Sequence, residues 1–284
     1  MKVEMVLVAG AGQMGAGIAQ VSAQAGMQVV LTDVADEFIA RGIAAIEKNL
    51  GRQVEKGKLE AAAREQTMAR ITTSLTLDAG RDADLLIEAA PEVVEIKQGL
   101  FAAGDALLRD EAIIATNTSS LSITGLATFT KRPDRFVGIH FFNPVPAMAL
   151  VEVVRGLETA DETVATARAF AESVGKTPIT VADSPGFVAN RILFPMINEA
   201  VFALYEGVAS AEEIDAGMKL GANHPMGPLA LADLVGLDTT LAIIETLHRD
   251  LGDPKYRPCP LLRRYVAAGK LGRKAGSGFY EYGG

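Results

Sequence analysis

Two titratable residues in this chain have the types and spacing that suit proton transfer. His140 ends an apolar segment, residues 136–140, whose composition is typical of a buried strand. Glu152 lies in the middle of a second such segment, residues 150–154. An imidazole can accept the proton of a substrate hydroxyl, and a carboxylate that accepts one ring N–H would orient the ring and stabilise its protonated form.

A carboxylate in an apolar strand is costly to bury unless it is paired, and a histidine on a neighbouring strand would pair it. We therefore expect His140 and Glu152 to contact each other. The alternatives are that His140 is a hydrogen-bonded histidine of the core and that Glu152 is an exposed residue of an edge strand.

Two further polar positions are candidates for binding a substrate or cofactor oxygen. Asn117-Thr118-Ser119-Ser120 follows an apolar strand at 112–116, and the carboxyl ends of strands face the ligand crevice of an open α/β sheet. Asn190 lies one turn into the first helix beyond residue 183, from where it would reach toward a cleft between two domains. The alternatives are an ordinary Ser/Asn turn and a solvated helix residue.

A glycine-rich hexapeptide, Gly10-Ala11-Gly12-Gln13-Met14-Gly15, fits the pattern G-x-G-x-x-G. An apolar strand at 3–9 precedes it, a helix at 18–25 follows it, and a second strand at 27–32 leads directly to Asp33. Such a βαβ unit binds the pyrophosphate of a dinucleotide at the N-terminus of its helix. The alternative is a tight structural turn.

The glycines and the acid have separate roles in this cofactor prediction. Gly10 permits the tight turn, Gly12 lets the backbone approach a pyrophosphate, and Gly15 lets the helix pack closely on the strand. Asp33 would accept hydrogen bonds from the adenosine ribose and repel a 2′-phosphate, and no Arg adjoins it in sequence. We therefore expect NAD rather than NADP, although the motif by itself also permits FAD.

The formal net charge of −8 disfavours nucleic acid as a partner, so an anionic substrate would need a local basic patch. Arg52 and Lys56 are four residues apart, and a helix would place them on one face. We expect this pair to bind phosphate groups. The alternative is an ordinary solvated face of a helix.

Strands alternate with helices over the first part of the chain, and helices alone follow. Strands are expected at 3–9, 27–32, 71–74, 85–88, 112–116, 135–142, 150–154 and 177–181. Helices are expected between them at 18–25, 91–108, 123–127 and 163–174, with a helical hairpin at about 36–70 interrupted at Gly51 and Gly57. Beyond Asp183, with Ser184 and Pro185 as helix-starting residues, helices are expected at 187–206 (bent at Pro195), 211–220 and 228–247. This order predicts an α/β fold with a Rossmann-type, doubly wound, mostly parallel sheet over 1–183 and an all-helical domain over 184–284.

The composition is that of a globular protein, with 49% hydrophobic and 22% charged residues. No apolar run approaches the ~20 residues of a membrane span, and the N-terminal run has no signal cleavage site, so we expect a cytoplasmic protein without a membrane partner. Cys259 is the single cysteine, which excludes an intrachain disulfide and agrees with a reducing compartment. It lies between two prolines, and we expect it to be an incidental thiol. No metal site is expected.

The chain closely resembles the 3-hydroxyacyl-CoA dehydrogenase family, and within it the bacterial 3-hydroxybutyryl-CoA dehydrogenases, from about Val6 to Tyr282. The motifs that carry the resemblance are GAGQMG, IEAAPE at 87–92, TNTSSL at 116–121, HFFNPVPAMALVEV at 140–153, DSPGFVANRI at 183–192, HPMGPLALADLVGLD at 224–238 and GSGFYEY at 276–282. Their order and spacing together are specific, and no functional position departs from the family pattern.

The resemblance implies a role for each matching residue. His140 corresponds to the general base and Glu152 to its carboxylate partner. Ser119 and Asn190 correspond to the residues that hold the hydroxyl and thioester oxygens of the substrate. The remaining implied contacts are Gly10, Gly12, Gln13, Met14, Gly15, Asp33, Glu92, Lys97, Asn117, Ser119 and Asn143 with NAD, and Asn49 and Lys56, besides Arg52, with the CoA part of the substrate.

The expected reaction is (S)-3-hydroxyacyl-CoA + NAD⁺ ⇌ 3-oxoacyl-CoA + NADH + H⁺, carried out by a homodimer that associates through its helical domain. We expect short acyl chains, because no hydratase domain is fused to the chain. Two alternatives remain open from the sequence. One is a dehydrogenase of a free hydroxy or sugar acid, as in gulonate-type relatives. The other is a non-catalytic dinucleotide-binding protein, against which the set His140, Glu152, Ser119 and Asn190 argues.

Overall fold

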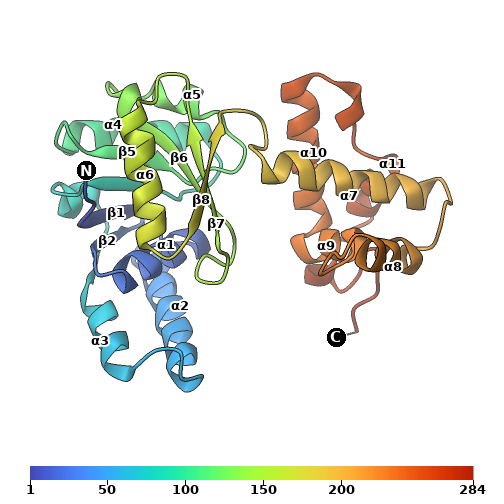
Figure 1. Cartoon of the computed structure of the whole chain (residues 1–284), viewed down its shortest axis with the longest axis horizontal. Coiled ribbons are helices and arrows are strands. Elements are labelled where there is room, and N and C mark those ends of the chain that lie inside the picture. The colour runs from blue at the N-terminus through green and yellow to red at the C-terminus, as the bar shows by residue number, and fades with distance from the viewer. Residues whose placement is uncertain (284) are drawn as a thin grey trace. The chain divides into compact units, whose positions relative to one another are not determined.

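The computed structural model describes residues 1–283 and divides into two compact units between Ser184 and Pro185 (Figure 1). Each unit has its own hydrophobic core. The first is an α/β unit built on one sheet, and the second consists of helices. No helix within residues 1–283 is both long enough and apolar enough to cross a membrane.

The sheet of the first unit has eight strands in the order β3-β2-β1-β4-β5-β6-β7-β8. All neighbours pair in parallel except β6 and β7, which are antiparallel. The first six strands therefore have the order of a doubly wound dinucleotide-binding sheet. The strands are β1 (Met5–Ala9), β2 (Gln28–Thr32), β3 (Ile71–Ser74), β4 (Leu85–Glu88), β5 (Ile113–Thr116), β6 (Phe136–Phe141), β7 (Leu150–Arg155) and β8 (Thr177–Ala182).

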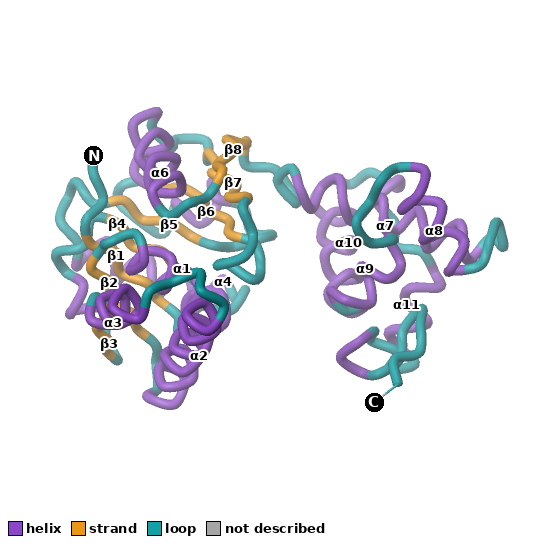
Figure 2. Tube along the Cα trace, turned by 60° about the horizontal axis from the view of Figure 1, so that its bottom comes forward, coloured by secondary structure: helices purple, strands orange, loops and turns teal. Residues whose placement is uncertain are grey.

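Helices cover both faces of this sheet, as the predicted doubly wound fold requires (Figure 2). Val6 and Val8 of β1 belong to the core that α1 and α6 share, whereas Leu7 faces the opposite side. On that opposite side Phe101 of α4 packs edge-on against Phe136 of β6. The helices are α1 (Gln13–Gln24), α2 (Asp36–Glu55), α3 (Ala61–Ala69), α4 (Val94–Leu107), α5 (Ile123–Ala127) and α6 (Asp161–Ser173), with short 3₁₀ turns at Leu77–Gly80 and Pro133–Arg135.

The predicted elements of the first unit occur within a few residues of their expected bounds. The helix after the glycine motif begins earlier than expected, at Gln13 rather than residue 18. The predicted hairpin is the pair α2 and α3, and α3 lies beside β3 (Figure 2). Gly51 does not interrupt α2, so that expectation was wrong. The chain leaves the helix instead at Gly57, whose φ of +64° lies in the left-handed region.

The second unit contains α7 (Ala189–Tyr205), α8 (Ala211–Gly221), α9 (Pro228–Val235), α10 (Leu237–Leu251) and α11 (Pro260–Ala267). The expected helix start at Ser184-Pro185 was wrong. Residues 185–188 form turns, and Phe187 has a φ of +49°, which a right-handed helix cannot contain. The expected single helix at 228–247 is two helices, because Gly236 between them has a φ of +103°. Pro195 lies inside α7, and the bend expected there stays a prediction.

Candidate active site

His140 and Glu152 face each other across the antiparallel pair of β6 and β7. They are direct partners in the strand register, and His140 Nδ1 lies 2.7 Å from Glu152 Oε2. Both side chains are buried, with exposed fractions of 7% and 0%. The carboxylate therefore favours the tautomer that carries its proton on Nδ1, which leaves Nε2 as the basic nitrogen.

The edge-strand alternative for Glu152 is wrong, because β7 pairs with β6 on one side and with β8 on the other. All six residues of β6 are buried, so the strand lies inside the sheet with helices on both faces. His140 occupies the fifth position of β6, at its carboxyl end, and its ring lies 4.5 Å from the Phe142 ring. This is the edge of the sheet at which an α/β protein binds its ligand.

The polar loop after β5 reaches the same edge of the sheet. Asn117 Oδ1 accepts a hydrogen bond of 2.9 Å from the backbone N–H of Phe141, which ties the loop to the residue after the histidine. Glu92 Oε1 accepts hydrogen bonds from Thr118 Oγ1 at 2.7 Å and from the Ser119 backbone N–H at 2.9 Å. The structure thus brings Ser119, Asn117 and Glu92 together at the carboxyl ends of β4, β5 and β6.

The glycine motif has the geometry that each of its residues predicts. Gly10 has a φ of +109°, and a Cβ there would lie 2.6 Å from Ala89 O. A Cβ on Gly15 would lie 1.8 Å from Gly10 O, so the helix packs on the turn without room for a side chain. A Cβ on Gly12 would have nothing within 4 Å, so one side of the turn is open to a ligand. These are the close and open contacts that a pyrophosphate cradle needs.

Asp33 holds this turn in place. Its Oδ2 accepts a hydrogen bond of 2.7 Å from the Ala11 N–H, and its Oδ1 accepts one of 2.7 Å from the Val34 N–H. A carboxylate offers about four acceptor sites, so capacity remains for ribose hydroxyls. Asp33 therefore connects the end of β2 to the glycine turn.

A cavity of about 1240 Å³ opens along the glycine turn, and it is larger than the ~300–1,000 Å³ usual for small ligands. That size fits an extended dinucleotide. Arg41 of α2 also lines it and is the only Lys or Arg to do so within residues 1–283; its guanidinium lies over the Phe38 ring. Arg41 was not identified from the sequence, because it lies eight residues after Asp33. Only the fold of the first turns of α2 places it beside the cofactor cavity. Polar residues from the sequence prediction that line the cavity are Gln13, Asp33, Asn49 and Asn143.

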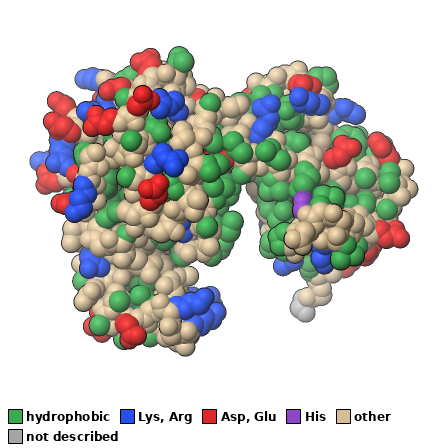
Figure 3. Space-filling model, in the orientation of Figure 1, with side chains coloured by type: hydrophobic (Ala, Val, Ile, Leu, Met, Phe, Trp, Pro, Cys, Tyr) green, Lys and Arg blue, Asp and Glu red, His purple; other side chains and the backbone are tan. Residues whose placement is uncertain are grey.

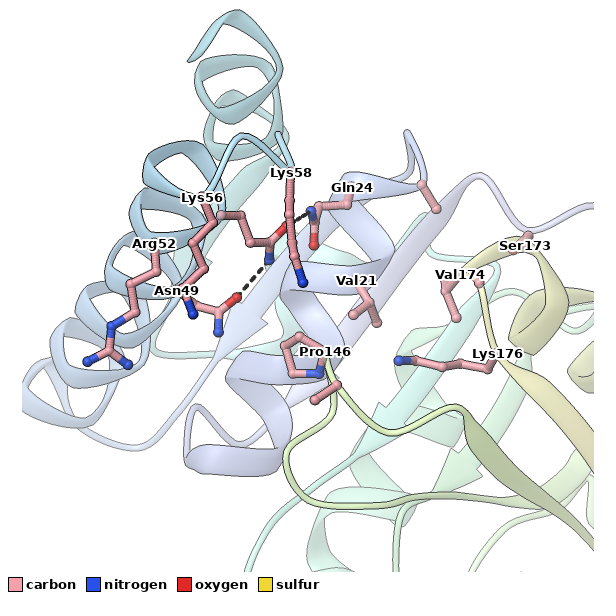
Figure 4. A pocket seen from close by; sticks show the side chains of 14 residues that line it. Val21, Gln24, Asn49, Arg52, Lys56, Lys58, Pro146, Ser173, Val174 and Lys176 are labelled. Carbon is pink, nitrogen blue, oxygen red and sulfur yellow. Dashed lines mark hydrogen bonds between the residues drawn. The ribbon is translucent and has the colours of Figure 1, made fainter. Parts of the chain in front are cut away.

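A second cavity of about 680 Å³ lies between α1, the end of α2 and the turn before β8 (Figure 4). Both predicted basic residues line it, and so do two that the sequence did not suggest, Lys58 and Lys176. No acidic side chain within the described residues lines it. A group of Lys and Arg side chains is also visible at the lower end of α2 in Figure 3. The cavity is therefore locally cationic in an acidic protein.

Asn49 lines both cavities. Its Oδ1 accepts hydrogen bonds from Gln20 Nε2 at 2.9 Å and from Gln53 Nε2 at 2.8 Å, and the second of these is drawn in Figure 4. Lys176 forms part of the other wall, where its Nζ donates to Val145 O at 2.5 Å and to Met148 O at 2.9 Å. Burial lowers the pKa of the Lys176 ammonium.

Lys97 and Asn190 line neither of these two cavities. Lys97 is only 1% exposed and pairs with Glu88 and Glu92. Asn190 is the second residue of α7 in the second unit and is 9% exposed, so the solvated alternative is wrong; its place beside a substrate stays a prediction. Cys259 is fully buried, and burial raises the pKa of its thiol.

Known proteins resemble the whole chain. Residues 5–184 match the model of the 3-hydroxyacyl-CoA dehydrogenase NAD binding domain, and residues 186–282 match that of the C-terminal domain. A probable 3-hydroxybutyryl-CoA dehydrogenase of Bacillus subtilis is 54% identical over 282 residues, covering 99% of this chain and 98% of that protein. The human mitochondrial hydroxyacyl-coenzyme A dehydrogenase is 43% identical over 288 residues, covering 99% and 91%. The crystal structure of a Ralstonia eutropha (S)-3-hydroxybutyryl-CoA dehydrogenase has a TM-score of 0.98 and 52% identity, and covers all of both chains.

The fold and the site together define the class of protein. The sheet is doubly wound, the glycine turn opens on a cavity large enough for a dinucleotide, and a His–Glu pair lies at the carboxyl edge of the sheet. These are the features of an NAD-dependent oxidoreductase. The matches over both parts of the chain then fix the family. The chain belongs to the 3-hydroxyacyl-CoA dehydrogenase family.

Proposed function

We propose that the protein interconverts short-chain (S)-3-hydroxyacyl-CoA and 3-oxoacyl-CoA, with 3-hydroxybutyryl-CoA and acetoacetyl-CoA as the preferred pair. The observation that carries this proposal is the 2.7 Å contact between His140 Nδ1 and Glu152 at the carboxyl end of β6. The names of the bacterial relatives, 3-hydroxybutyryl-CoA dehydrogenases, support the substrate and its chain length.

His140 acts as the general base in this proposal. Glu152 holds the ring by Nδ1, so that Nε2 takes the proton of the substrate hydroxyl, and the carboxylate stabilises the imidazolium that results. In the reverse direction the same nitrogen returns the proton. Bound NAD supplies the acceptor for the hydride that leaves C3. Ser119 and Asn190 would hold the substrate oxygens, as their counterparts in the family pattern imply.

The cationic cavity is the proposed site for the phosphates of CoA. Arg52 and Lys56 line it together, and Asn49 connects it to the cofactor cavity. The net charge of −8 repels an anionic substrate at long range, so the phosphates need a local group of cations to bind them, and this cavity provides one. This feature also favours a CoA thioester over a free hydroxy acid, the alternative substrate class.

The helical unit, residues 184–284, is proposed to complete the substrate site and to form a homodimer. Several large apolar side chains of this unit are exposed, including Ile192 at 65%, Val208 at 73% and Leu220 at 87%, and such residues often become covered on association. Light scattering of the purified protein tests the dimer, and a monomer at micromolar concentration would overturn it. A cytoplasmic location, supported by a buried unpaired cysteine, is part of the same proposal.

The experiment that tests the function is NADH oxidation with acetoacetyl-CoA, compared with acetoacetate, with longer 3-oxoacyl-CoA thioesters and with NADPH. We expect the highest kcat/KM for acetoacetyl-CoA with NADH. Faster turnover of the free acid would instead support the hydroxy-acid alternative. No turnover of any of these, in a protein that binds NADH, would support the non-catalytic one.

A further inference from the structure

Glu88 is a fully buried carboxylate at the last position of β4, outside every role discussed so far. Its Oε1 accepts hydrogen bonds from the Lys97 ammonium and from the Ala90 N–H, both at 2.6 Å. Its Oε2 accepts one from Thr116 Oγ1, also at 2.6 Å. Both carboxylate oxygens are therefore engaged, and the three partners come from α4, from the loop after β4 and from β5.

The contacts continue from Glu88 to the loop that carries Ser119. The Lys97 ammonium, paired with Glu88, also lies 3.2 Å from Glu92 Oε2. The other oxygen of Glu92 accepts from Thr118 Oγ1 and from the Ser119 N–H. An unbroken line of short polar contacts therefore runs from the interior carboxylate to the loop.

The contacts from Glu88 to the loop of Ser119 lie in the half of the sheet that binds the nicotinamide part of a dinucleotide. The glycine turn and Asp33 belong to β1 and β2, the half of such a sheet that binds adenosine. Glu88 and Thr116 are register partners at the ends of β4 and β5, in the other half, over which the nicotinamide part of a dinucleotide lies. Glu88 is also the register partner of Ala9, which immediately precedes the glycine motif.

Burial makes the line sensitive to charge. The side chains of Lys97 and Glu88 are 1% and 0% exposed, whereas Glu92 is 40% exposed. A buried ion pair contributes little net stability, because desolvation of both ions offsets their attraction. Removal of one partner is costly because the other ion is left uncompensated. An ammonium that lost Glu88 would draw on Glu92 instead and pull it away from Thr118 and the Ser119 N–H.

We propose that Glu88 is a positioning residue for the nicotinamide half of the cofactor site. By fixing the Lys97 ammonium it holds Glu92, and through Glu92 it holds the loop of Ser119. In this proposal the Lys97 ammonium acts on the loop of Ser119 through its contact with Glu92. The inference concerns the binding of the dinucleotide, so of the proposed function it needs only the use of NAD and not the identity of the acyl substrate.

The test compares two variants for NADH affinity, measured by the fluorescence of NADH, and for the Tm of the ligand-free protein. Glu88→Gln keeps the shape of the side chain but removes its charge, and we expect about tenfold weaker NADH binding together with a lower Tm. Glu88→Gln/Lys97→Met removes both charges. We expect it to recover much of the Tm, while NADH binding stays about tenfold weaker because Glu92 has lost its partner.

Asp84→Asn is the matched control, because Asp84 lies just before the other end of β4. It is 8% exposed, accepts hydrogen bonds from the backbone of Glu4 and Met5, and pairs with Arg109. We expect this variant to lose Tm and to keep its NADH affinity within about twofold.

Three results would overturn the proposal: unchanged NADH affinity in Glu88→Gln, recovery of affinity along with Tm in the double variant, or an equal loss of affinity in Asp84→Asn. If Glu88→Gln does not fold, recovery of NADH affinity in the double variant would still overturn the proposal. NADH binding needs no acyl substrate, so failure of the wild type to reduce acetoacetyl-CoA would contradict the proposed reaction without affecting this comparison.

Discussion

The contact between His140 and Glu152 follows from the register of one antiparallel strand pair. The two residues are direct partners of β6 and β7, and β6–β7 is the only antiparallel pairing in the sheet as described for residues 1–283. A shift of one residue in that register would point one of the two side chains to the other face of the sheet. The orientation of the proposed base is therefore set by the sheet itself and not by a loop.

The first prediction is that His140 and Glu152 act as one unit. General acid–base catalysis is typically worth about 10²–10⁴-fold, so His140→Gln should lower kcat by about that factor. Glu152→Gln should lose much of the same factor, because the ring loses its charged partner. Steady-state kinetics of the double variant is the decisive measurement. Two residues of one unit give losses that do not multiply, and a rate near the product of the two single losses would separate their roles.

Cofactor preference is the second prediction. Asp33 holds the glycine turn and would repel a 2′-phosphate, so NADH should give a higher kcat/KM than NADPH. Asp33→Ala should narrow that difference, because Arg41 lines the same cavity and would then attract the phosphate. Adding Arg41→Ala should widen it again. A preference of the wild type for NADPH would contradict the assignment.

The third prediction concerns Gly15, where a side chain has no room. Gly15→Ala places a Cβ against Gly10 O and should lower stability by roughly 3 kcal/mol, the upper end of the cost of overpacking, and weaken NADH binding. Gly51→Ala is the matched control inside α2, where a Cβ would meet nothing within 4 Å. It should raise stability by about 0.5–1 kcal/mol. Urea unfolding of both variants measures the difference, and equal effects would refute it.

The cofactor half of the site could be predicted from sequence because its signals are local. The glycine motif and Asp33 fall within one βαβ unit, and the pattern of that unit specifies their positions. The partnership of His140 and Glu152 could also be expected, since a buried carboxylate needs a partner. The register of the two strands could not be predicted. β6 and β7 are buried on both faces, so they lack the alternation of polar and apolar residues from which a register can be read.

Other features depend on tertiary contacts that no short segment records. Lys176 enters the cationic cavity from the turn before β8, far in sequence from Arg52. Glu88 and Lys97 pair across a strand and a helix. The false helix start at Ser184-Pro185 arose because its residue types suit a cap, whereas the chain forms a turn through Phe187 before α7 begins.

Binding of the CoA phosphates gives the fourth prediction. Lys56→Ala should raise KM for acetoacetyl-CoA several-fold and leave KM for NADH nearly unchanged, because Lys56 lines only the cationic cavity. Lys48→Ala on the exposed face of the same helix is the control and should change neither value. The KM for the thioester should also rise with ionic strength, as salt screens the attraction. If Lys48→Ala raises this KM as much as Lys56→Ala does, general charge rather than the cavity is responsible.

The last prediction concerns the pH dependence of stability at Lys176. Burial lowers the pKa of this ammonium below its ordinary value of 10.5, so between the two values the folded protein binds fewer protons at this site than the unfolded chain. The contribution of Lys176 to stability should therefore increase as pH rises through the lowered pKa toward 10.5, opposite to the behaviour of a lysine in an ion pair. Lys176→Met removes this dependence together with the hydrogen bonds to Val145 O and Met148 O. The Tm of the wild type minus that of Lys176→Met should grow over this alkaline range, and a difference that shrinks would mean that the folded state favours the charged amine.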